Sequence, residues 1–257
     1  MHKMQGQTGK KRIGSRGSAL EQAPSLGEIQ GLDLANLKIS KTQLEEEAMI
    51  QFQAQFKQDL KPRPVPGLSE RQINDHFDVK YKGYVAKFNE IQKNLKEADK
   101  PKANPNYSGI RELLVERLYC HNSIKLHEAY WQCLSGAGDP PDLIKQMISE
   151  DFGSYNAWKE EFKACGLSAR GWSVCGFDLD SGRIFNVLTD THSIAAWNVV
   201  PLMIMDMYEH AYYIDYGASV KTYVEEGFLP NMSWNYAARM LNRHPLAQHR
   251  TSLLKAA

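Results

Sequence analysis

The residue types best suited to chemistry lie in the run from Asp206 to His210, near the C-terminal end of the sequence. A carboxylate and an imidazole stand four residues apart there, directly after the apolar segment 199–205. Iron, manganese and zinc all accept such mixed oxygen and nitrogen ligands, and a buried ion pair would use the same two side chains. The run therefore indicates half of a metal site and leaves the metal open.

A first helix is expected to carry another imidazole. Ser69 and Gln72 form a capping-box pattern, and apolar residues then recur at helical spacing up to Leu95. Residues four positions apart lie on one face of a helix, so His76 and Tyr84 are expected to share a stripe.

A second helix is predicted over residues 110–134, where His127 and Trp131 lie on one face. The connection through residues 101–108 contains prolines and is short, which favours an antiparallel helical hairpin. The two helices would then bring His76 and His127 toward one another, as the other half of the metal site.

These residues together resemble the iron/manganese superoxide dismutase family. Three segments agree in order and spacing: His76 with Tyr84, His127 with Trp131, and Asp206 followed by Glu209-His210-Ala211-Tyr212-Tyr213. Supporting matches are Asp151-Phe152-Gly153-Ser154 and Gly171-Trp172. The resemblance extends over about residues 64–241, and three such segments in the right order rarely coincide by chance.

The resemblance implies a superoxide dismutase, which converts superoxide to dioxygen and hydrogen peroxide by one-electron cycling of one iron or manganese ion per subunit. The implied metal ligands are His76, His127, Asp206 and His210. On general grounds, an aspartate favours the oxidised ion and neutral imidazoles favour the reduced ion, so a mixed set suits a metal that cycles between two charges.

The resemblance also implies the surroundings of the metal. Tyr84, Trp131 and Trp172 would form walls that limit its exposure. In the family the glutamate before the last ligand reaches the partner subunit, so Glu209 implies a homodimer, and the expected assembly is a homodimer or tetramer.

The sequence departs from the family at the partner of the metal-bound solvent. Family members commonly use a glutamine, either four residues before the second histidine or just after the second strand. This chain has Ser123 and His192 at those positions. We expect His192 to be the solvent's partner, because an imidazole donates or accepts a hydrogen bond according to its tautomer.

The expected entrance differs as well. The family often has a histidine four residues after the first ligand and an arginine ten after the last, where this chain has Lys80 and Val220. Lys80 and Lys221 are the cations expected to attract an anionic substrate. The tryptophan expected two residues after the metal-binding aspartate is Tyr208.

The expected fold class is α+β. An N-terminal helical hairpin would be followed by two short helices, up to about Cys165, and then by a C-terminal domain with a three-stranded antiparallel sheet wrapped by helices. Residues 172–177 and 183–188 flank an Asp-Ser-Gly turn and read as a β-hairpin. Periodicity alone fits residues 199–205 to a strand or a buried helix equally, and the resemblance implies the strand.

Three parts of the chain are expected: an extension over residues 1–62, a hairpin domain over 63–138 and an α/β domain over 139–257. The extension is expected to be partly disordered or helical. Its first 20 residues hold five lysines and arginines and no acidic residue. A disordered basic tail is the favoured interpretation, and an organelle transit segment is the alternative.

Composition narrows the class of protein. The chain has 257 residues, 42% of them hydrophobic, and a net charge of +1. This balance argues against a nucleic-acid partner, and the lack of 18 consecutive apolar residues argues against a membrane partner. The four cysteines show no CxxC spacing and favour reduced thiols, although a Cys165–Cys175 bridge stays open. A cytoplasmic location is expected.

Two alternative functions remain at this point. One is a catalytically silent protein of the same fold that serves as a structural subunit of a larger assembly, such as a mitochondrial ribosome. The other is a metal-dependent hydrolase or oxygenase that uses the same ligands.

Overall fold

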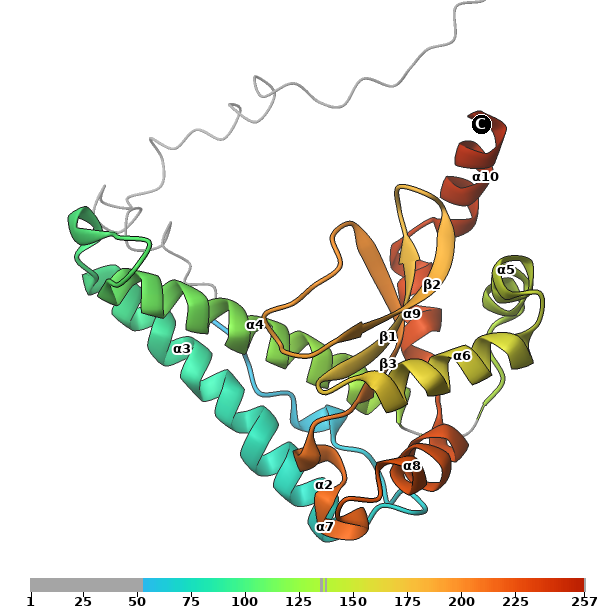
Figure 1. The fold of residues 1–257 in the computed structure, drawn as a ribbon, viewed down its shortest axis with the longest axis horizontal. Helices are drawn as coiled ribbons and strands as arrows, with labels where there is room; N and C mark the ends of the chain where they lie inside the picture. Colours follow the sequence, from blue (N-terminus) through green and yellow to red (C-terminus); the bar gives the residue numbers. More distant parts are fainter. Residues whose placement is uncertain (1–52, 135, 137, 257) are drawn as a thin grey trace, which may run out of the picture. The chain divides into compact units, whose positions relative to one another are not determined.

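Two long helical segments form the first half of the fold in the computed structural model, which describes residues 53–134, 136 and 138–256. The expectations for residues 1–52 lie outside the described residues. The first segment runs without a break through α2 (Glu70–Asn74), η3 (Asp75–Tyr81) and α3 (Lys82–Glu97). After the single turn η4 (Lys100–Lys102), α4 (Gly109–Cys133) returns beside α3 (Figure 1).

Serine caps begin both segments. The hydroxyl of Ser69 accepts a hydrogen bond from the backbone N–H of Gln72, and Ser108 caps α4 by accepting from the N–H of Arg111. The apolar stripe of α3, with Val85, packs against that of α4. The predicted antiparallel hairpin is confirmed, with helix boundaries within one or two residues of those expected.

The turn η3 between α2 and α3 is π-helical, with its backbone hydrogen bonds one residue longer than in an α-helix. It carries three buried side chains, His76, Phe77 and Tyr81. From the sequence, His76 and Tyr84 are expected on one face of a regular α-helix. The backbone between them instead departs locally from α-helical spacing. Such turns are often found at functional sites.

Two shorter helices connect the hairpin to the sheet. They are α5 (Asp142–Phe152) and α6 (Tyr155–Ser168). Gly153 ends α5 with a φ of 82°, a conformation that glycine adopts without strain, and Ser154 caps α6.

The sheet has three antiparallel strands in the order β2-β1-β3. They are β1 (Trp172–Asp178), β2 (Arg183–Thr189) and β3 (Val199–Asp206). The α+β fold class and the strand at residues 199–205 are thus confirmed. In the central strand Trp172 pairs directly with Asp206 on β3.

Helices cover both faces of this sheet (Figure 1). Val174 faces α4, where it lines a pocket together with Leu126. Ser173 and Cys175 face α6 and hydrogen-bond to Phe162 and Trp158. This alternation along β1 is the expected pattern for a strand buried on both faces. All four cysteines are free, so no Cys165–Cys175 bridge forms.

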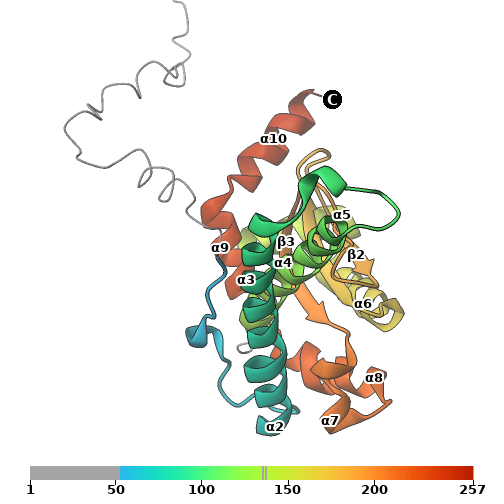
Figure 2. The same ribbon diagram turned by 90° about the vertical axis from the view of Figure 1, so that its left-hand side faces the viewer.

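After β3 the chain forms mostly short helical segments. They are η5 (Glu209–Ala211), α7 (Tyr213–Tyr216), α8 (Val220–Thr222), η6 (Tyr223–Phe228), η7 (Leu229–Asn231), α9 (Asn235–Arg243) and α10 (Leu246–Ala256). Figure 2 shows α7 beside α2, so the chain after β3 returns to the hairpin. The buried Arg250 ties α10 to Asp151 of α5 with two hydrogen bonds.

None of the helices formed by the described residues has the length and apolarity needed to span a membrane.

Candidate metal centre

The four predicted metal ligands converge on one point. One potential ligand atom from each of His76, His127, Asp206 and His210 lies within 4.8 Å of the other three. The Oδ2 atom of Asp206 is 3.1 Å from His76 Nε2, 3.5 Å from His127 Nε2 and 3.2 Å from His210 Nε2. Three imidazole nitrogens and a carboxylate oxygen therefore face a common centre.

Four different kinds of local structure hold these side chains. His76 lies in the π-helical turn η3 and His127 in the middle of α4. Asp206 is the last residue of β3, and His210 lies in the short helical turn η5. The first three are buried, whereas the His210 side chain keeps 13% of its surface exposed.

The electrostatics of the site favour the protonation states in which these side chains bind a metal ion. Burial lowers the pKa of His76 to about 4 and lowers the pKa of His127 well below its usual range. For Asp206 burial alone would raise the pKa, but the charge and the hydrogen bond of His210 outweigh burial and lower the pKa. Two neutral imidazoles thus face an ionised carboxylate, which is what metal binding requires.

Two buried imidazole nitrogens that lack hydrogen-bond partners within the described part of the chain show that the site fits a cation. His127 Nδ1 lies 2.6 Å from the backbone oxygen of Ser123, so this nitrogen carries the proton and Nε2 offers a lone pair. Among the described residues, His76 Nε2 and His127 Nε2 are buried and make no well-oriented hydrogen bond. Buried polar atoms of this kind are rare without a partner, and a metal ion at the centre would satisfy both.

Further hydrogen bonds orient Asp206. Its Oδ1 atom accepts from the backbone N–H of Tyr208 at 2.9 Å, which leaves Oδ2 directed at the histidines. The hydroxyl of Tyr223 donates to its backbone oxygen at 2.8 Å, and Tyr130 lies behind at 3.3 Å. Asp206 is therefore held by one hydrogen bond at its carboxylate and one at its backbone.

Gln72 joins the two halves of the site and was not predicted to do so. The sequence places it in a capping box with Ser69, but the side-chain amide does not close that box. Its Nε2 donates to the backbone oxygen of His210 at 2.6 Å, and its Oε1 accepts from the N–H of Ile214 at 3.0 Å. The N–H of Ser69 is satisfied by Asp215 instead. No local pattern indicates contacts across so many residues.

The predicted aromatic residues surround the ligands. The ring centroid of Trp131 lies 4.5 Å from that of His76, and Trp172 lies edge-on to His127 at 5.1 Å. Tyr84 lies 5.4 Å from His127. Both indoles are buried. Together they exclude water from the sides of the centre and restrict the imidazole orientations.

His192 is buried beside this wall. Its Nδ1 accepts a hydrogen bond from Trp172 Nε1 at 2.8 Å, so Nε2 carries the proton in the neutral ring and points to the Tyr84 hydroxyl at 3.4 Å. Burial lowers the pKa of His192 to about 4 and keeps the ring neutral. Ser123, the other position considered, donates its hydroxyl to the backbone of Tyr119.

The backbone of His192 is fixed as well. Its N–H donates to the Tyr208 hydroxyl at 3.2 Å, and its oxygen accepts from Asn122 Nδ2 at 2.6 Å. The neighbouring Gly171 allows this loop to approach closely, because an added Cβ would lie 2.7 Å from the backbone oxygen of Thr189. Hydrogen bonds and close backbone packing therefore hold the loop that carries His192 next to the site.

An open pocket of about 670 Å³ lies next to His210. Lys80, Arg170 and Glu209 line it together with Val220. Lys221 is not among the lining residues, and its charge instead contributes to lowering the pKa of Glu225. Arg170 was missed in the sequence, where a single basic residue next to Gly171-Trp172 carries no distinguishing signal.

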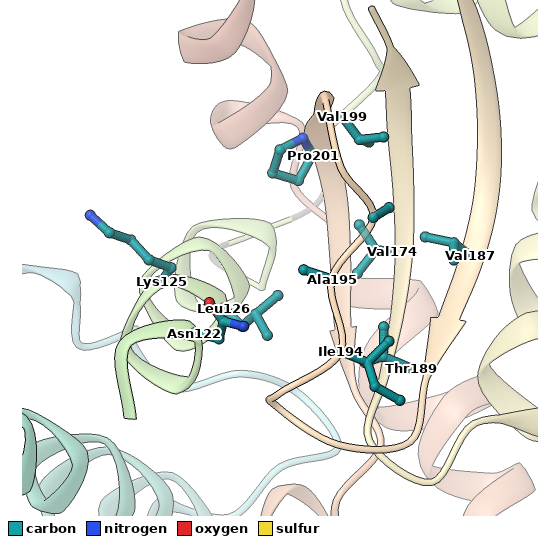
Figure 3. Close-up of a pocket in the computed structure, with 11 residues that line it drawn as sticks. Asn122, Lys125, Leu126, Val174, Val187, Thr189, Ile194, Ala195, Val199 and Pro201 are labelled. Carbon is teal, nitrogen blue, oxygen red and sulfur yellow. The ribbon is translucent and has the colours of Figure 1, made fainter. Parts of the chain in front are cut away.

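A second pocket, of about 160 Å³, lies between α4, the sheet and the loop that follows His192 (Figure 3). Its walls are mainly apolar and include Leu126, Val174 and Ile194. The Lys125 side chain extends away from the sheet in this view. This pocket is lined by none of the four ligands, whereas the pocket described above is lined by His210.

Comparison with known proteins agrees with this geometry. The family described as iron/manganese superoxide dismutases, C-terminal domain, matches residues 140–240. An iron superoxide dismutase of Aquifex aeolicus is 42% identical over 187 residues, which cover 70% of this chain and 87% of that protein. The iron superoxide dismutase of Aquifex pyrophilus is 42% identical over 185 residues, with 70% and 86% covered.

Relatives named for the other metal match as well. A manganese superoxide dismutase of Haloferax volcanii is 34% identical over 178 residues, covering 67% of this chain and 86% of that protein. These matches extend over most of the relatives' length, and the family match over residues 140–240 includes Asp206 and His210 of the buried centre. The chain therefore belongs to the iron/manganese superoxide dismutase family.

Proposed function

We propose that this protein is a superoxide dismutase that uses one iron or manganese ion per subunit. The observation that carries the proposal is the convergence of His76, His127, Asp206 and His210 within 4.8 Å, with two orphaned imidazole nitrogens directed at the centre. The relatives named for iron and for manganese support the same assignment.

When bound, the ion supplies one-electron chemistry, in which one superoxide is oxidised to dioxygen and a second is reduced, with two protons, to hydrogen peroxide. The protein itself keeps the ligand side chains in the protonation states and orientations that metal binding needs. Asp206 stays ionised and His127 holds its proton on Nδ1 against Ser123, so neither of these two ligands needs to lose a proton or rotate between turnovers.

His192 and Tyr84 are the residues we assign to proton handling. The His192 ring is neutral, its Nδ1 is occupied by Trp172, and its Nε2 proton points to the Tyr84 hydroxyl. Tyr84 keeps its own proton because burial raises the pKa of the phenol. The pair therefore holds protons at defined atoms beside the ligands. Because both ring nitrogens of His192 are engaged, we assign the hydrogen bond to solvent at the centre to the Tyr84 hydroxyl, with His192 as its support.

Trp131 and Trp172 act by exclusion and orientation. Both indoles are buried against the ligand histidines, and Trp172 also fixes the His192 ring. A small anion would approach through the pocket beside His210, where we assign the attractive charges to Lys80 and Arg170. Steering of this kind weakens as salt is added, because mobile ions screen exposed charges.

We also propose that Glu209 reaches a second copy of the chain, giving a homodimer or tetramer. Glu209 is exposed and lines the same pocket as Arg170 and His210. A cytoplasmic location is part of the proposal, supported by the free thiols of four cysteines. The hairpin over residues 63–138 and the α/β part over 139–257 are proposed as two domains that supply two ligands each.

The test is to strip the metal from the purified protein and reload separate samples with iron, manganese and zinc. Zinc accepts the same donors but does not cycle between charges, so it is the matched control. Dismutation of superoxide by the iron or manganese sample, and none by the zinc sample, is expected. One metal bound per chain without activity in either redox sample would overturn the proposal and favour a structural role.

A further inference from the structure

Asn122 holds the loop that carries His192 from the side of the hairpin. Its Nδ2 atom donates to the backbone oxygen of His192 at 2.6 Å, across 70 residues of sequence. The side chain is partly buried and belongs to α4. Figure 3 shows it on the side of the helix that faces this loop and the sheet. No motif in the sequence singles out Asn122.

The loop exposes much of its length to solvent. Residues 190–198 form no helix or strand, and all of residues 194–198 are exposed. At its two ends the loop is tied to the backbone beside β1. The Asp190 carboxylate accepts from the N–H of Arg170, just before that strand, and the Asn198 oxygen accepts from the backbone just after it. The hydrogen bond from α4 falls between these ties, at the residue whose ring enters the site.

The His192 ring makes two hydrogen bonds that depend on where its backbone lies. Its Nδ1 accepts from Trp172 Nε1 at 2.8 Å, and its Nε2 lies 3.4 Å from the Tyr84 hydroxyl. Trp172 belongs to β1 and Tyr84 to α3, so the ring has to reach partners on two different elements. The contact with Tyr84 is already long for a hydrogen bond, so a small retreat of the backbone would break it.

We propose that Asn122 is a positioning residue for the proposed dismutation, an inference that rests on the function proposed above. By holding the His192 backbone against α4, the amide keeps the imidazole within reach of the Tyr84 hydroxyl, to which we assign the hydrogen bond to solvent. Asn122 therefore acts on the centre through His192 and Tyr84.

Two substitutions separate the hydrogen bond from the volume of the side chain. Asn122→Asp keeps the shape but places a carboxylate oxygen where the donor was, opposite a carbonyl oxygen. Asn122→Leu keeps a similar volume without a donor. Asn106→Asp adds the same charge at an exposed position and is the control for the first. Lys125→Met changes an exposed residue that lines the same pocket as Asn122 and is the control for the second.

The direct readout is the indole N–H of Trp172, observed by NMR in zinc-loaded protein, which is diamagnetic. This N–H is bonded to His192 Nδ1, so its exchange with solvent reports how firmly the ring is held. We expect exchange about tenfold faster in both Asn122 variants and unchanged in both controls. The indole N–H of Trp158, which is bonded to Asn186, is the internal reference and should not change.

Kinetics of samples loaded with the active metal provide the second readout. Both Asn122 variants should lose about fivefold in kcat with unchanged metal content, because proton handling after capture depends on His192 and Tyr84. Capture of superoxide, measured by kcat/KM, should stay within about twofold, because Asn122 does not line the pocket beside His210. Equal losses of kcat and of bound metal would mean a purely structural role and would overturn the inference.

Unchanged exchange of the Trp172 indole in both Asn122 variants would also overturn it. If both variants fail to fold, a crystal structure of the metal-loaded wild type decides, because it should show Asn122 Nδ2 within hydrogen-bonding distance of the His192 oxygen. A longer separation would contradict the inference. A wild type that binds iron or manganese without activity would instead refute the proposed function, while the exchange measurement would still decide whether Asn122 positions His192.

Discussion

The two ligands from the hairpin and the two from the sheet side are held in different ways. His76 and His127 sit inside continuous helical segments, and their rings meet edge-on at 5.0 Å within a packed core. Asp206 ends a strand, and His210 lies in a single turn whose backbone oxygen is held by Gln72 from the hairpin. Figure 2 shows the hairpin and the chain after β3 meeting at α2 and α7.

The difference suggests a division of labour. Packing and one hydrogen bond within α4, from His127 to Ser123, keep the hairpin imidazoles in place. The sheet side instead supplies the charge and relies on hydrogen bonds that cross from the hairpin. We therefore expect the sheet-side ligands to be the more sensitive to single substitutions, and the changes below test this from the largest effect to the smallest.

Asp206→Ala should cause the largest loss. If roughly 12 kcal/mol of binding free energy is shared among four ligands, one ligand accounts for about 3 kcal/mol, or about a 100-fold loss of metal affinity. Competition with a chelator measures this directly. Asp142→Ala, which removes an exposed carboxylate from the first turn of α5, is the control. Equal metal affinity in Asp206→Ala and wild type would show that the charged ligand of the sheet side takes no part in metal binding.

His192→Phe should separate activity from metal binding. The substitution removes the partner of Tyr84 and leaves the indole N–H of Trp172 unpaired. We expect activity to fall about 10- to 100-fold and stability to fall by about 1–3 kcal/mol, with metal retained. Metal content and dismutation rate are measured on the same preparation, with His244→Phe, at an exposed position after α9, as control. Metal loss in step with activity would mean that His192 supports the ligands rather than the reaction.

Gln72→Ala tests the dependence of the sheet side on the hairpin. The backbone oxygen of His210 and the N–H of Ile214 lose their partner, so η5 should loosen. We expect about a tenfold loss of metal affinity and about 1–3 kcal/mol of stability, measured by chelator competition and urea unfolding. Gln146→Ala removes an exposed glutamine that pairs with Glu150 on α5 and serves as the control. If metal affinity stays the same, the proposed dependence is wrong.

Lys57→Met should have the smallest effect and sharpens the hairpin side of the comparison. Lys57 pairs with Glu128, which also accepts from Tyr81, and the Tyr81 ring stacks on His127. Since the Lys57 side chain is 47% exposed, solvent screening limits the cost to about 1 kcal/mol of unfolding free energy. Metal affinity should stay within about twofold, with Lys87→Met, which removes the exposed pair with Glu90, as control. A larger loss of metal would show that the hairpin ligands also depend on contacts from outside the two helices.

Local patterns predicted the regular elements well. The helix expected over residues 110–134 is Gly109–Cys133, and the strand expected over 172–177 is Trp172–Asp178. Apolar spacing and serine caps act over a few residues, so a single sequence contains them. The resemblance resolved residues 199–205 as a strand, which periodicity left open.

The parts that sequence missed depend on contacts between distant segments. Gln72 was assigned to a local cap because nothing in its neighbourhood indicates His210, which is 138 residues away. Arg170 owes its place to tertiary packing in the same way. The π-helical turn also went unseen, because its apolar residues keep a spacing that an ordinary helix would show. The structure places His192 beside Tyr84, and its role stays a prediction.

The π-helical turn η3 has a consequence for how this protein tolerates changes in chain length. A π turn holds one more residue than the α-helical turn it replaces. Deleting one residue between Asp75 and Tyr81 would therefore let the segment relax to an ordinary α-helix while the turns on either side keep nearly the same orientation. Gln72 would still face His210, whereas His76, which lies inside the turn, would shift relative to the other ligands. The extra residue thus sets the place of one ligand without changing the direction of the helices that flank it.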